Sequence, residues 1–532
     1  MSRQKAAADK GRGAKPPAKR TPPPPPPPPA PEFVRPPIPL VIAVVLTAVL
    51  EVLDITIVNV AMPHMLGAFG ATADQITWVL TSYIVAAAVV MPLTGYLSNW
   101  LGRRRLLLLS ITGFIVSSIA CGMAWNLESI VFFRLAQGVF GAPLVPLSQA
   151  ILLDAFPREK HGQALAIFGL GIMVAPVIGP ALGGYLTETY SWRMVFYINI
   201  PIGMIALLLS VGYLPQRAIR DIKTDWLGLG LLIVAVGALQ FVLDQGQMRD
   251  WFNSKVIVVG TIITVFTTAA FFLRGWNKPD NIIDLSLLKD RNFVAGTLAI
   301  TLYGISLFGI MALMPLFTQR LLGYPADVAG TIFIPRGIIS AITLAITGGL
   351  LIRIFDPRWL VASGLVLTAA GTLLMSHFTL YVDYWGIATP NMVAGVGTGL
   401  FFVPLTAVAF ASVASAKYDE ASGIYSLMRG IGGSAGIAVV SWLFVRQTHI
   451  HFAELTAHVT PYNAELVPYL AERGLSPFSP QAGPMIGHEL ARQAQMLAFN
   501  DMFWFIGIVT LAITPVLFFM TRPKEVSLVP AH

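Results

Sequence analysis

Charged residues and cysteines are scarce in this chain of 532 residues. Lys, Arg, Asp and Glu make up 12% of it, whereas an ordinary soluble protein has about 25%. Hydrophobic residues make up 55%. This balance excludes an ordinary soluble protein and indicates a membrane protein. The single cysteine, Cys121, excludes an intramolecular disulfide and a thiolate metal cluster.

Patterns for nucleotide-driven or enzymatic chemistry are missing as well. No GxxxxGK[ST] phosphate loop occurs, so we do not expect ATP to drive the protein. No HExxH or nucleophile–base pattern stands out, and His449 and His451 are too few to predict a metal site. We therefore expect neither an enzyme nor a bound metal or cofactor. Membrane topology explains the basic N-terminus more simply than nucleic-acid binding does.

Long apolar runs are what the sequence has in abundance. Each is about 20 residues long, the length that spans a bilayer, and together they predict an all-α membrane protein. The first is too long for a signal-peptide core, so we expect it to be retained. The fourteen runs lie near 38–62, 76–98, 105–124, 129–153, 163–186, 193–213, 226–244, 254–273, 292–318, 326–352, 358–379, 385–413, 420–445 and 499–521.

Positive charge alternates from one connection to the next. With an even number of spans both termini lie on one side, and that side carries most of the 35 Lys and Arg. The positive-inside rule then places both termini in the cytoplasm. Residues 1–37 include an unbroken run of prolines and predict a solvated arm. That arm either helps to set the topology or docks a partner or anionic lipid.

A weak internal repeat divides the chain. "GAPLVPLS" (141–148) and "GLFFVPLT" (399–406) share Gly, Val, Pro, Leu and a closing hydroxyl residue in register, as is typical of transporters built from two halves. The expected regions are a disordered Lys/Arg- and Pro-rich cytoplasmic tail (1–37), an N-terminal six-helix half (38–214), a linker with two extra membrane helices (215–290), a C-terminal six-helix half (291–521) that includes a long outside connection (446–498), and a cytoplasmic tail (522–532).

Six motifs resemble those of the major facilitator superfamily and, within it, of the fourteen-helix drug:proton antiporter branch, and the long connection 446–498 resembles that of the EmrB-type multidrug efflux pumps in that branch. They are "LDITIVNVAMP" (53–63), "GYLSNWLGRRR" (95–105), "RLAQGVFGAPLVP" (134–146), "GIMVAPVIGPALGG" (171–184), "LDQGQMRDWF" (243–252) and "RGIGGSAG" (429–436). Three features depart from the pattern: Asn99 replaces the usual acid of its loop, Glu51 lies outside the first-helix signature, and the proline arm is additional.

The resemblance implies a fold, a function and partners. The fold would be two six-helix halves around a central cavity, with two extra helices between them. The function would be proton-driven export of hydrophobic or amphipathic drugs across the bacterial inner membrane by alternating access, with protons as the coupling ion. A periplasmic adaptor protein and an outer-membrane channel would complete a tripartite pump, and residues 446–498 would contact the adaptor.

Two acids and one arginine are the candidate proton-coupling residues. Asp54 lies about 12 Å, and Arg134 about 8 Å, from the outer ends of their predicted helices, so the two side chains can meet. An acid within the bilayer usually faces the bundle interior, and by resemblance Asp54 is the proton carrier. The alternative is a static pair that joins two helices. Glu51, three residues earlier on the same helix face, is a second proton site or cation attractor, or it faces a watery vestibule.

Two further motifs are candidates for gating. Small residues spaced by four predict close helix packing, and prolines permit a bend. The alternative is packing without a gating role. The candidates are Gly171, Ala175, Pro176, Gly179, Pro180, Gly183 and Gly184 in the run 163–186, and Gly95, Gly102, Arg103 and Arg104 before the run 105–124.

Arginines within the second half are the last candidates. We expect Arg336 and Arg429 near the cytoplasmic parts of their helices, where each pins a gate, with Asp419 as one possible partner, or binds an anionic group of the substrate. Asp244 is expected at the membrane interface. Two other functions remain open from the sequence: export of a single metabolite or siderophore, and a receptor or scaffold that does not transport.

Overall fold

The computed structural model describes residues 36–215, 225–276, 281–460, 463, 466–476 and 478–521, without the side chains of 73–74, 177 and 326–327. From Pro36 onward these residues belong to one compact unit. The tail predicted at 522–532 and all but the end of the tail predicted at 1–37 lie outside the described residues. Within the described ranges every regular element is a helix.

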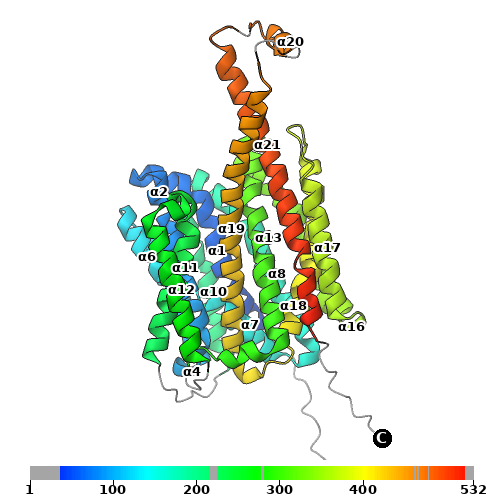
Figure 1. Cartoon of the computed structure of the whole chain (residues 1–532). Helices are drawn as coiled ribbons and strands as arrows, with labels where there is room; N and C mark the ends of the chain where they lie inside the picture. Colours follow the sequence, from blue (N-terminus) through cyan, green and yellow to red (C-terminus); the bar gives the residue numbers. More distant parts are fainter. Residues whose placement is uncertain are drawn as a thin grey trace, which may run out of the picture. The chain divides into compact units, whose positions relative to one another are not determined.

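Among the described residues, fourteen helical segments are long and apolar enough to cross a membrane, which confirms the number of spans that the sequence predicted (Figure 1). The first six are α1 (Ile38–Phe69), α3 (Trp78–Val90) with η1 (Met91–Leu93) and α4 (Thr94–Leu101), α5 (Arg103–Gly122), α6 (Leu127–Gly141) with α7 (Leu144–Ala155), η2 (Arg158–Lys160) with α8 (His161–Thr189), and α9 (Met194–Tyr197) with α10 (Asn199–Tyr213).

The other eight spans follow after a gap in the described residues. They are α11 (Trp226–Gln245), α12 (Lys255–Gly275), α13 (Arg291–Pro315) with η6 (Leu316–Leu321), α14 (Ala326–Thr331) with α15 (Phe333–Ile346), η7 (Thr347–Leu351) and α16 (Ile352–Ile354), α17 (Pro357–Met375), α18 (Tyr384–Phe410), η8 (Ser415–Lys417) with α19 (Tyr418–Ala457), and α21 (Ala482–Leu511) with η9 (Thr514–Phe519). Shorter helices in the connections include α2 (Ala73–Ile76), η5 (Leu285–Lys289) and α20 (Leu466–Ala471).

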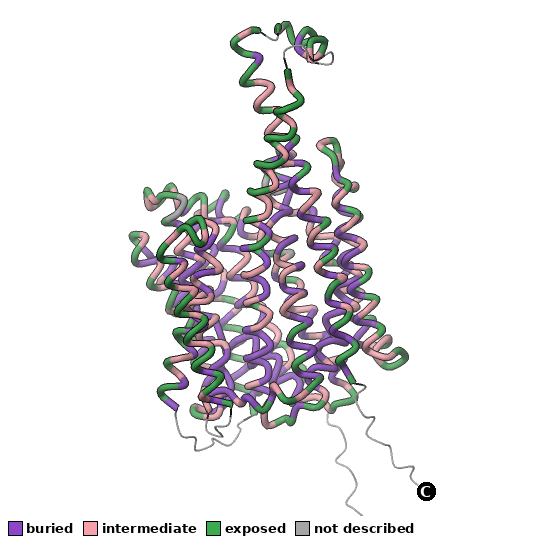
Figure 2. The backbone as a smooth tube through the Cα atoms, in the orientation of Figure 1, coloured by how far each residue is buried: buried purple, intermediate pink, exposed green. Residues whose placement is uncertain are grey.

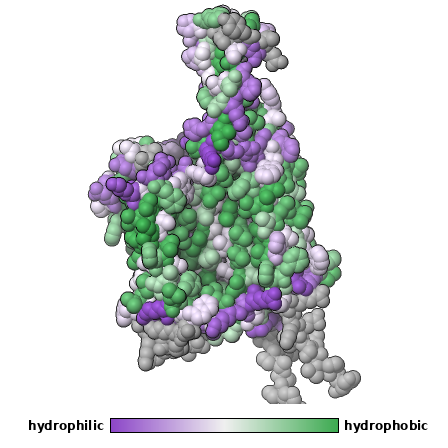
Figure 3. Space-filling model, viewed as in Figure 1, coloured by the Kyte–Doolittle hydropathy of each residue, from purple (hydrophilic) through white to green (hydrophobic). Residues whose placement is uncertain are grey.

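The bundle has two distinct faces. Because the number of spans is even, α1 begins and η9 ends on the same face, which we call the terminal face. On the opposite face α19 and α21 project beyond the other helices (Figure 1), and we call this projection, residues 446–498, the extension. An apolar belt covers the middle of the face seen in Figure 3 and gives way to polar residues toward both ends, as a bilayer requires.

The extension is more helical than the sequence led us to expect. Its residues were assigned to an outside connection, but α19 continues to Ala457 and α21 already begins at Ala482. No proline interrupts α19, so its backbone hydrogen bonds continue past the apolar run. Figure 2 shows that this part is largely exposed, whereas the membrane part of the bundle is buried inside.

Packing is close within each half and continues between the halves. In the first half α1 packs against α8, α10 and α7, and in the second α13 packs against α19 and α18. The halves meet where α15 lies on α8 and where α19 lies on α7 and α4. One buried apolar cluster contains Leu153 and Leu165 of the first half together with Phe402 and Leu405 of the second.

The two extra helices pack against each other beside this interface. α12 is peripheral, since only 11% of its apolar window is buried. α11 touches both halves: its Asp244 accepts a hydrogen bond from Thr81 of α3, and its Gln240 donates one to Ser434 of α19. The insert is therefore attached to both halves through polar side chains within the bundle.

Candidate functional site

Asp54 and Arg134 form an ion pair inside the first half. Both side chains are 0% exposed, and Nη1 of Arg134 lies 2.5 Å from Oδ2 of Asp54. Arg134 also donates from Nε to the carbonyl of Val79 at 3.1 Å. Its guanidinium lies 4.2 Å from the ring centroid of Tyr83, a cation–π arrangement. The contact that the sequence predicted between α1 and α6 is therefore present.

Amide side chains complete the environment of Asp54. Its Oδ1 accepts hydrogen bonds from Nδ2 of Asn199 at 2.8 Å and from Nε2 of Gln137 at 2.9 Å. Ser118 lies within hydrogen-bond distance of both amides and donates to the carbonyl of Phe196. Four helices, α1, α5, α6 and α10, thus supply one enclosed polar network. Every hydrogen bond of Asp54 in this network comes from a donor, so both of its oxygens act as acceptors.

The charges of this network are balanced only while Asp54 is ionised. An arginine does not lose its proton in proteins, so adding a proton to Asp54 leaves a buried positive charge without its partner. Nη2 of Arg134 is also buried and has no hydrogen-bond partner in the described chain. The network can therefore respond to a proton by rearranging, which a fully apolar core could not do.

Glu51 faces the other half of the protein. It is 4% exposed, and its Oε2 accepts a hydrogen bond of 3.0 Å from the backbone N–H of Val145. That N–H lies in the first turn of α7, where the helix dipole favours an anion. Glu51 also interacts electrostatically with Arg429 of α19. A carboxylate on α1 is thereby linked to both halves.

Arg336 does not lie where the sequence suggested. It falls in the first third of the span Val328–Ile354, which runs toward the terminal face, so it lies nearer the extension face. Its Nη1 reaches Oδ1 of Asn391 at 3.4 Å. Asp419, proposed as a partner for Arg336 or Arg429, is instead bound by Arg103. The prediction was wrong because it ignored the direction in which this span runs.

A polar cluster joins the halves at the terminal face; we call it the terminal clamp. Arg103 of α5 donates from Nε and Nη2 to Asp419 of α19, at 3.0 and 2.6 Å, and from Nη1 to Asp154 of α7 at 2.9 Å. Ser98 of α4 donates to Asp419 at 2.5 Å. Bidentate arginine–carboxylate pairs are strong and directional, so the clamp binds the two halves together at this face.

Asn99 contributes a second contact to the terminal clamp. Its amide donates to Oε1 of Glu420 in α19 at 3.1 Å. Beside it, a methyl group added at Gly95 would overlap both the side chain and the backbone of Glu420, so only glycine permits this approach. Arg158 donates to backbone carbonyls in residues 411–413 of the other half. The amide at position 99 thus joins the halves without an ion pair of its own.

Two other residues of this motif act within the first half. Gly102 separates α4 from α5 with a φ of +85°, a backbone conformation that favours glycine. Arg104 donates to the carbonyl of Val211 in α10 at 2.6 Å. Of the four gating candidates in this loop, Gly95 and Arg103 contact the second half, whereas Gly102 and Arg104 shape the first.

The small residues of α8 face α1. Methyl groups added at three of these glycines would overlap side chains of α1, so the two helices lie as close as the spacing predicted. The pairs are Gly171 with Val45, Gly179 with Thr56, and Gly183 with Ile57. Ala175 is buried, Pro176 and Pro180 lie inside the continuous helix, and the methyl of an alanine at Gly184 would make only an ordinary contact.

Another face of α8 borders a groove. The groove has a volume of about 350 Å³ and lies between α8 and α15, where the halves meet. Its lining is wholly apolar and comprises Met173, Val174, Ile178, Ala181, Ile334, Gly337, Ile338 and Ala341. α8 therefore packs tightly against its own half and more loosely, in this region, against the other.

Comparisons with known proteins agree with this architecture. The sequence profile described as Major Facilitator Superfamily matches residues 44–437. The chain belongs to the Major Facilitator Superfamily. It is 35% identical to Multidrug export protein EmrB of Escherichia coli K12, over 91% of this chain and 95% of that protein. It is also 35% identical to Fatty acid resistance protein FarB of Neisseria gonorrhoeae, over 90% and 95%.

A solved structure supports the fold. The human organic anion transporter MFSD10 superposes with a TM-score of 0.60 at 16% identity, covering 90% of this chain and 99% of that one. The Major Facilitator fold predicted from the motifs is therefore confirmed, and this superfamily member is a multi-pass membrane transporter and not an enzyme. Its polar networks should be read as parts of a transport device.

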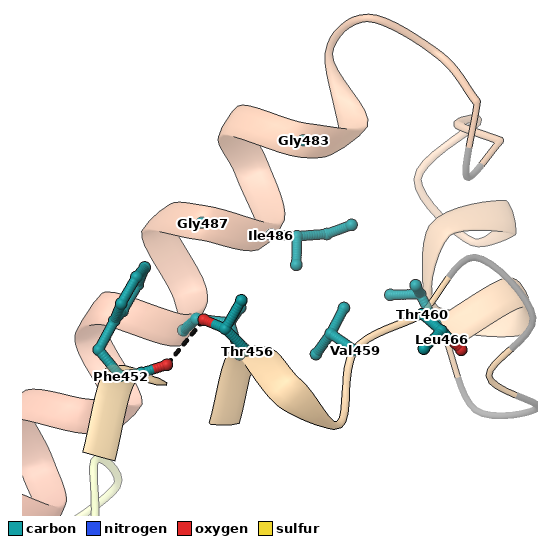
Figure 4. A pocket seen from close by; sticks show the side chains of 9 residues that line it. Phe452, Thr456, Val459, Thr460, Leu466, Gly483, Ile486 and Gly487 are labelled. Atoms are coloured by element: carbon teal, nitrogen blue, oxygen red, sulfur yellow. Dashed lines mark hydrogen bonds between the residues drawn. The ribbon is translucent and has the colours of Figure 1, made fainter. Parts of the chain in front are cut away.

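The extension adds a pocket outside the membrane part of the superfamily fold. Two residues of its base, Gln447 and His451, contact Asp501, which ties α19 to α21. Near the tip lies a pocket of about 280 Å³ (Figure 4), in which Ile486 and Val459 point toward each other. The lining residues are Phe452, Thr456, Val459, Thr460, Leu466, Gly483, Ile486, Gly487 and Leu490.

Sequence reasoning missed several members of these networks. Gln137 stands inside a quoted motif, three residues after Arg134 and hence on the same helix face, so it could have been found. Glu420 directly follows Asp419, the acid already named from the sequence, at the start of a span, which was also a usable signal. Ser118, the second of two adjacent serines, and Asn199 are uncharged polar residues in apolar runs, and nothing in the sequence distinguishes them.

Proposed function

We propose that this transporter exports hydrophobic or amphipathic drug-like molecules in exchange for protons, across the bacterial inner membrane and by alternating access. The names of two relatives, a multidrug export protein and a fatty acid resistance protein, support the substrate class. The observation that carries the proposal of proton coupling is the Asp54–Arg134 pair, which is completely enclosed and balanced by a single negative charge.

Protonation of Asp54 is the proposed coupling step. A proton from outside cancels the carboxylate charge, and Oδ1 or Oδ2 then carries a hydrogen that must find an acceptor. The amides of Gln137 and Asn199 and the guanidinium of Arg134 lose an ionised partner, so the four helices no longer favour their present spacing. When Asp54 returns to Arg134, the proton leaves toward the cytoplasm.

Glu51 and Arg429 would transmit this change to the second half. Glu51 precedes Asp54 by about one helical turn of α1 and acts on Arg429 across the interface. Arg429 belongs to α19, and the same helix carries Asp419 and Glu420 of the terminal clamp. A shift of α1 therefore reaches the clamp along one rigid helix. Opening the clamp would admit substrate from the terminal face, which the distribution of Lys and Arg assigns to the cytoplasm.

The extension is the proposed contact for a periplasmic adaptor protein, which would connect the transporter to an outer-membrane channel. It projects from the face opposite the terminal face, and its tip offers a small apolar pocket (Figure 4). Apolar pockets with a defined shape are where anchor residues of a partner bind. With the terminal face in the cytoplasm, the extension would lie in the periplasm.

The proposal is tested in everted vesicles under an imposed pH gradient. Wild-type protein should drive a hydrophobic dye across the membrane, and dissipating the gradient should stop it. Asp54→Asn should be inserted normally and yet lose gradient-driven transport. Normal pumping by Asp54→Asn would contradict the assignment of the proton site. If wild-type protein moves no drug but a deletion strain stops secreting one metabolite, the protein is a dedicated exporter instead.

A further inference from the structure

Arg336 is a buried arginine without a counter-ion. Its residue is 7% exposed, so the guanidinium is almost entirely removed from water. The other two arginines classed as buried, Arg103 and Arg134, each bind a carboxylate at 2.9 Å or less. Among the side chains that the structure describes, no carboxylate lies within ion-pairing distance of Arg336, and the side chain that it contacts is the amide of Asn391.

The hydrogen bonds of Arg336 are incomplete as well. Nη2 is buried and has no partner in the described chain. Nη1 has only the bond to Asn391, and 3.4 Å is long for an N–H to carbonyl hydrogen bond. Because arginine stays protonated in proteins, it cannot relieve this situation by losing its charge. A strong donor for an anion is therefore left unused in the membrane part of the protein.

The polar neighbours of Arg336 are already engaged with one another. Asn391 donates to the carbonyl of Ile387 at 3.1 Å, and Ser340, one turn along α15, donates to the carbonyl of Gly395 at 2.9 Å. Their orientation is therefore set, and they do not neutralise the guanidinium.

Tyr303 of α13 contacts α18, the helix that also carries Asn391. Its hydroxyl is 2.8 Å from Oγ1 of Thr398, and its ring stacks on Phe401 with centroids 4.0 Å apart. Three helices of the second half, α13, α15 and α18, thus combine one free cationic donor with aromatic surface. A ligand with one anionic group and an apolar body requires both features, a cationic donor for the anion and an apolar surface for the body.

We propose that Arg336 is an anion-recognition site that binds the carboxylate of amphipathic organic acids during export. A carboxylate is planar and matches the donors of a guanidinium edge, and its single charge is what one unpaired arginine needs. The inference rests on the proposed export function and deepens it, because it names a substrate class and a residue that distinguishes this class from neutral drugs. The site lies in the half opposite Asp54, so substrate and proton act on different halves.

Binding to purified full-length protein tests the site separately from transport. We would use decanoate, below its micellar concentration, and decanol as the neutral ligand of equal chain length, and measure the melting temperature of the protein in detergent. Decanoate should raise the melting temperature of wild type, with decanol giving a smaller shift. In Arg336→Gln the apparent affinity for decanoate should fall roughly tenfold or more, as expected for a lost charge-assisted hydrogen bond, while that for decanol is unchanged.

Two variants control this experiment. Arg353→Gln removes an exposed arginine of α16 in the same span and should bind decanoate like wild type. Arg336→Lys keeps the charge without the planar donor edge and should retain part of the affinity. Without ligand, Arg336→Gln should melt no lower than wild type, because it removes an unpaired buried charge.

Each outcome decides the proposal. Equal affinity of Arg336→Gln and wild type for decanoate would overturn it, as would an equal loss for decanoate and decanol. Stabilisation by phosphatidylglycerol but not by decanoate would assign the guanidinium to a lipid phosphate and also overturn it. Selective decanoate binding in a protein that fails to transport would support the site while contradicting the proposed export function.

Discussion

The carboxylate of Asp419 receives two hydrogen bonds from the guanidinium of Arg103, at 2.6 and 3.0 Å, and the two residues belong to different halves of the transporter. Arg103 at the same time holds Asp154 of its own half. One guanidinium thus carries both an internal and a cross-half contact. Any conformation in which the terminal face is open requires that the second contact be broken.

Weakening this contact should favour the open terminal face. We expect Asp419→Asn to shift the equilibrium toward open molecules by roughly tenfold, which corresponds to about 1.4 kcal/mol. Spin labels at Trp100→Cys and Phe355→Cys, both exposed and on different halves, would report the change in a Cys121→Ser background. The distance distribution should gain a longer component. Glu159→Gln, an exposed acid on the same face, is the matched control, and a distribution unchanged by Asp419→Asn would contradict the clamp.

The Asp54–Arg134 pair should also contribute measurably to the stability of the folded protein. Removing one partner of a buried pair typically costs about 3–5 kcal/mol, because the other charge is left uncompensated. Asp54→Ala should therefore lower the melting temperature markedly in detergent, and Arg134→Met added to it should restore a large part of the loss. If the double variant is as unstable as Asp54→Ala, the charge on Arg134 is not the cause.

The link between Glu51 and Arg429 can be measured with a double-mutant cycle. Glu51→Gln keeps an oxygen acceptor for Val145 but loses the charge, and Arg429→Gln removes the opposite charge. We expect a coupling free energy of about 0.5–3 kcal/mol in melting experiments, the range found for residues in one network. Transport by Glu51→Gln should be altered but not abolished, in contrast to Asp54→Asn. Strict additivity of the two substitutions would mean that the residues act independently.

Asp284 provides a prediction about pH, since it lies outside the membrane-spanning segments. Burial alone would raise the pKa of Asp284, but hydrogen bonds from Lys417 and Ser286 outweigh it and lower the pKa below the ordinary 3.8. A lowered pKa means that ionised Asp284 stabilises the folded state at neutral pH and that this contribution is lost as the pH falls through the folded-state pKa.

Comparison with Asp284→Asn should make that loss measurable. Wild type should be more stable than the variant at pH 7, by less than about 1 kcal/mol because the pair is partly exposed. The difference should shrink as the pH is lowered from about 5 toward 3, below the ordinary pKa of an aspartate. Glu472→Gln, in the exposed tip of the extension, should show no such trend. If the stability difference between wild type and Asp284→Asn instead grows on acidification, the pKa of Asp284 is not lowered in the folded protein.

A substitution in the pocket of the extension should have different effects on the drug resistance of whole cells and on transport in vesicles. Ile486→Asp places a charge in this apolar pocket and should reduce drug resistance of whole cells while leaving transport in vesicles unchanged. Phe478→Asp alters an exposed residue of the same tip that does not line the pocket, and it should affect neither assay. Equal loss in both assays for Ile486→Asp would mean that the extension supports the fold and not a partner.

Much of the fold could be predicted because membrane spans obey simple rules. Length and apolarity revealed all fourteen spans, and the depth of Asp54 and Arg134, counted in helical rise, brought the pair together correctly. The depth of Arg336 was predicted wrongly because the direction of its span was not applied.

The remaining contacts depend on tertiary packing and have no recognisable pattern in the local sequence. That Asn99 meets Glu420, or that Asn199 reaches Asp54, follows from how helices distant in sequence are placed, and one polar residue in an apolar run looks like any other. The end of α19 was misjudged for a different reason. Apolarity reports where the bilayer ends, and a helix can continue into water as long as its backbone is satisfied.

Helix α11 is hydrogen-bonded to Thr81 of one half and to Ser434 of the other, and this limits how the two extra helices can be altered. If the two halves move against each other, as the proposed alternating access requires, α11 cannot keep both contacts. One of its two hydrogen bonds would then break in every transport cycle. The cost of breaking it would add to the free-energy barrier between the two conformations. Deleting α11 and α12 to obtain a twelve-helix protein would remove this connection, so the two halves would be held together by fewer contacts.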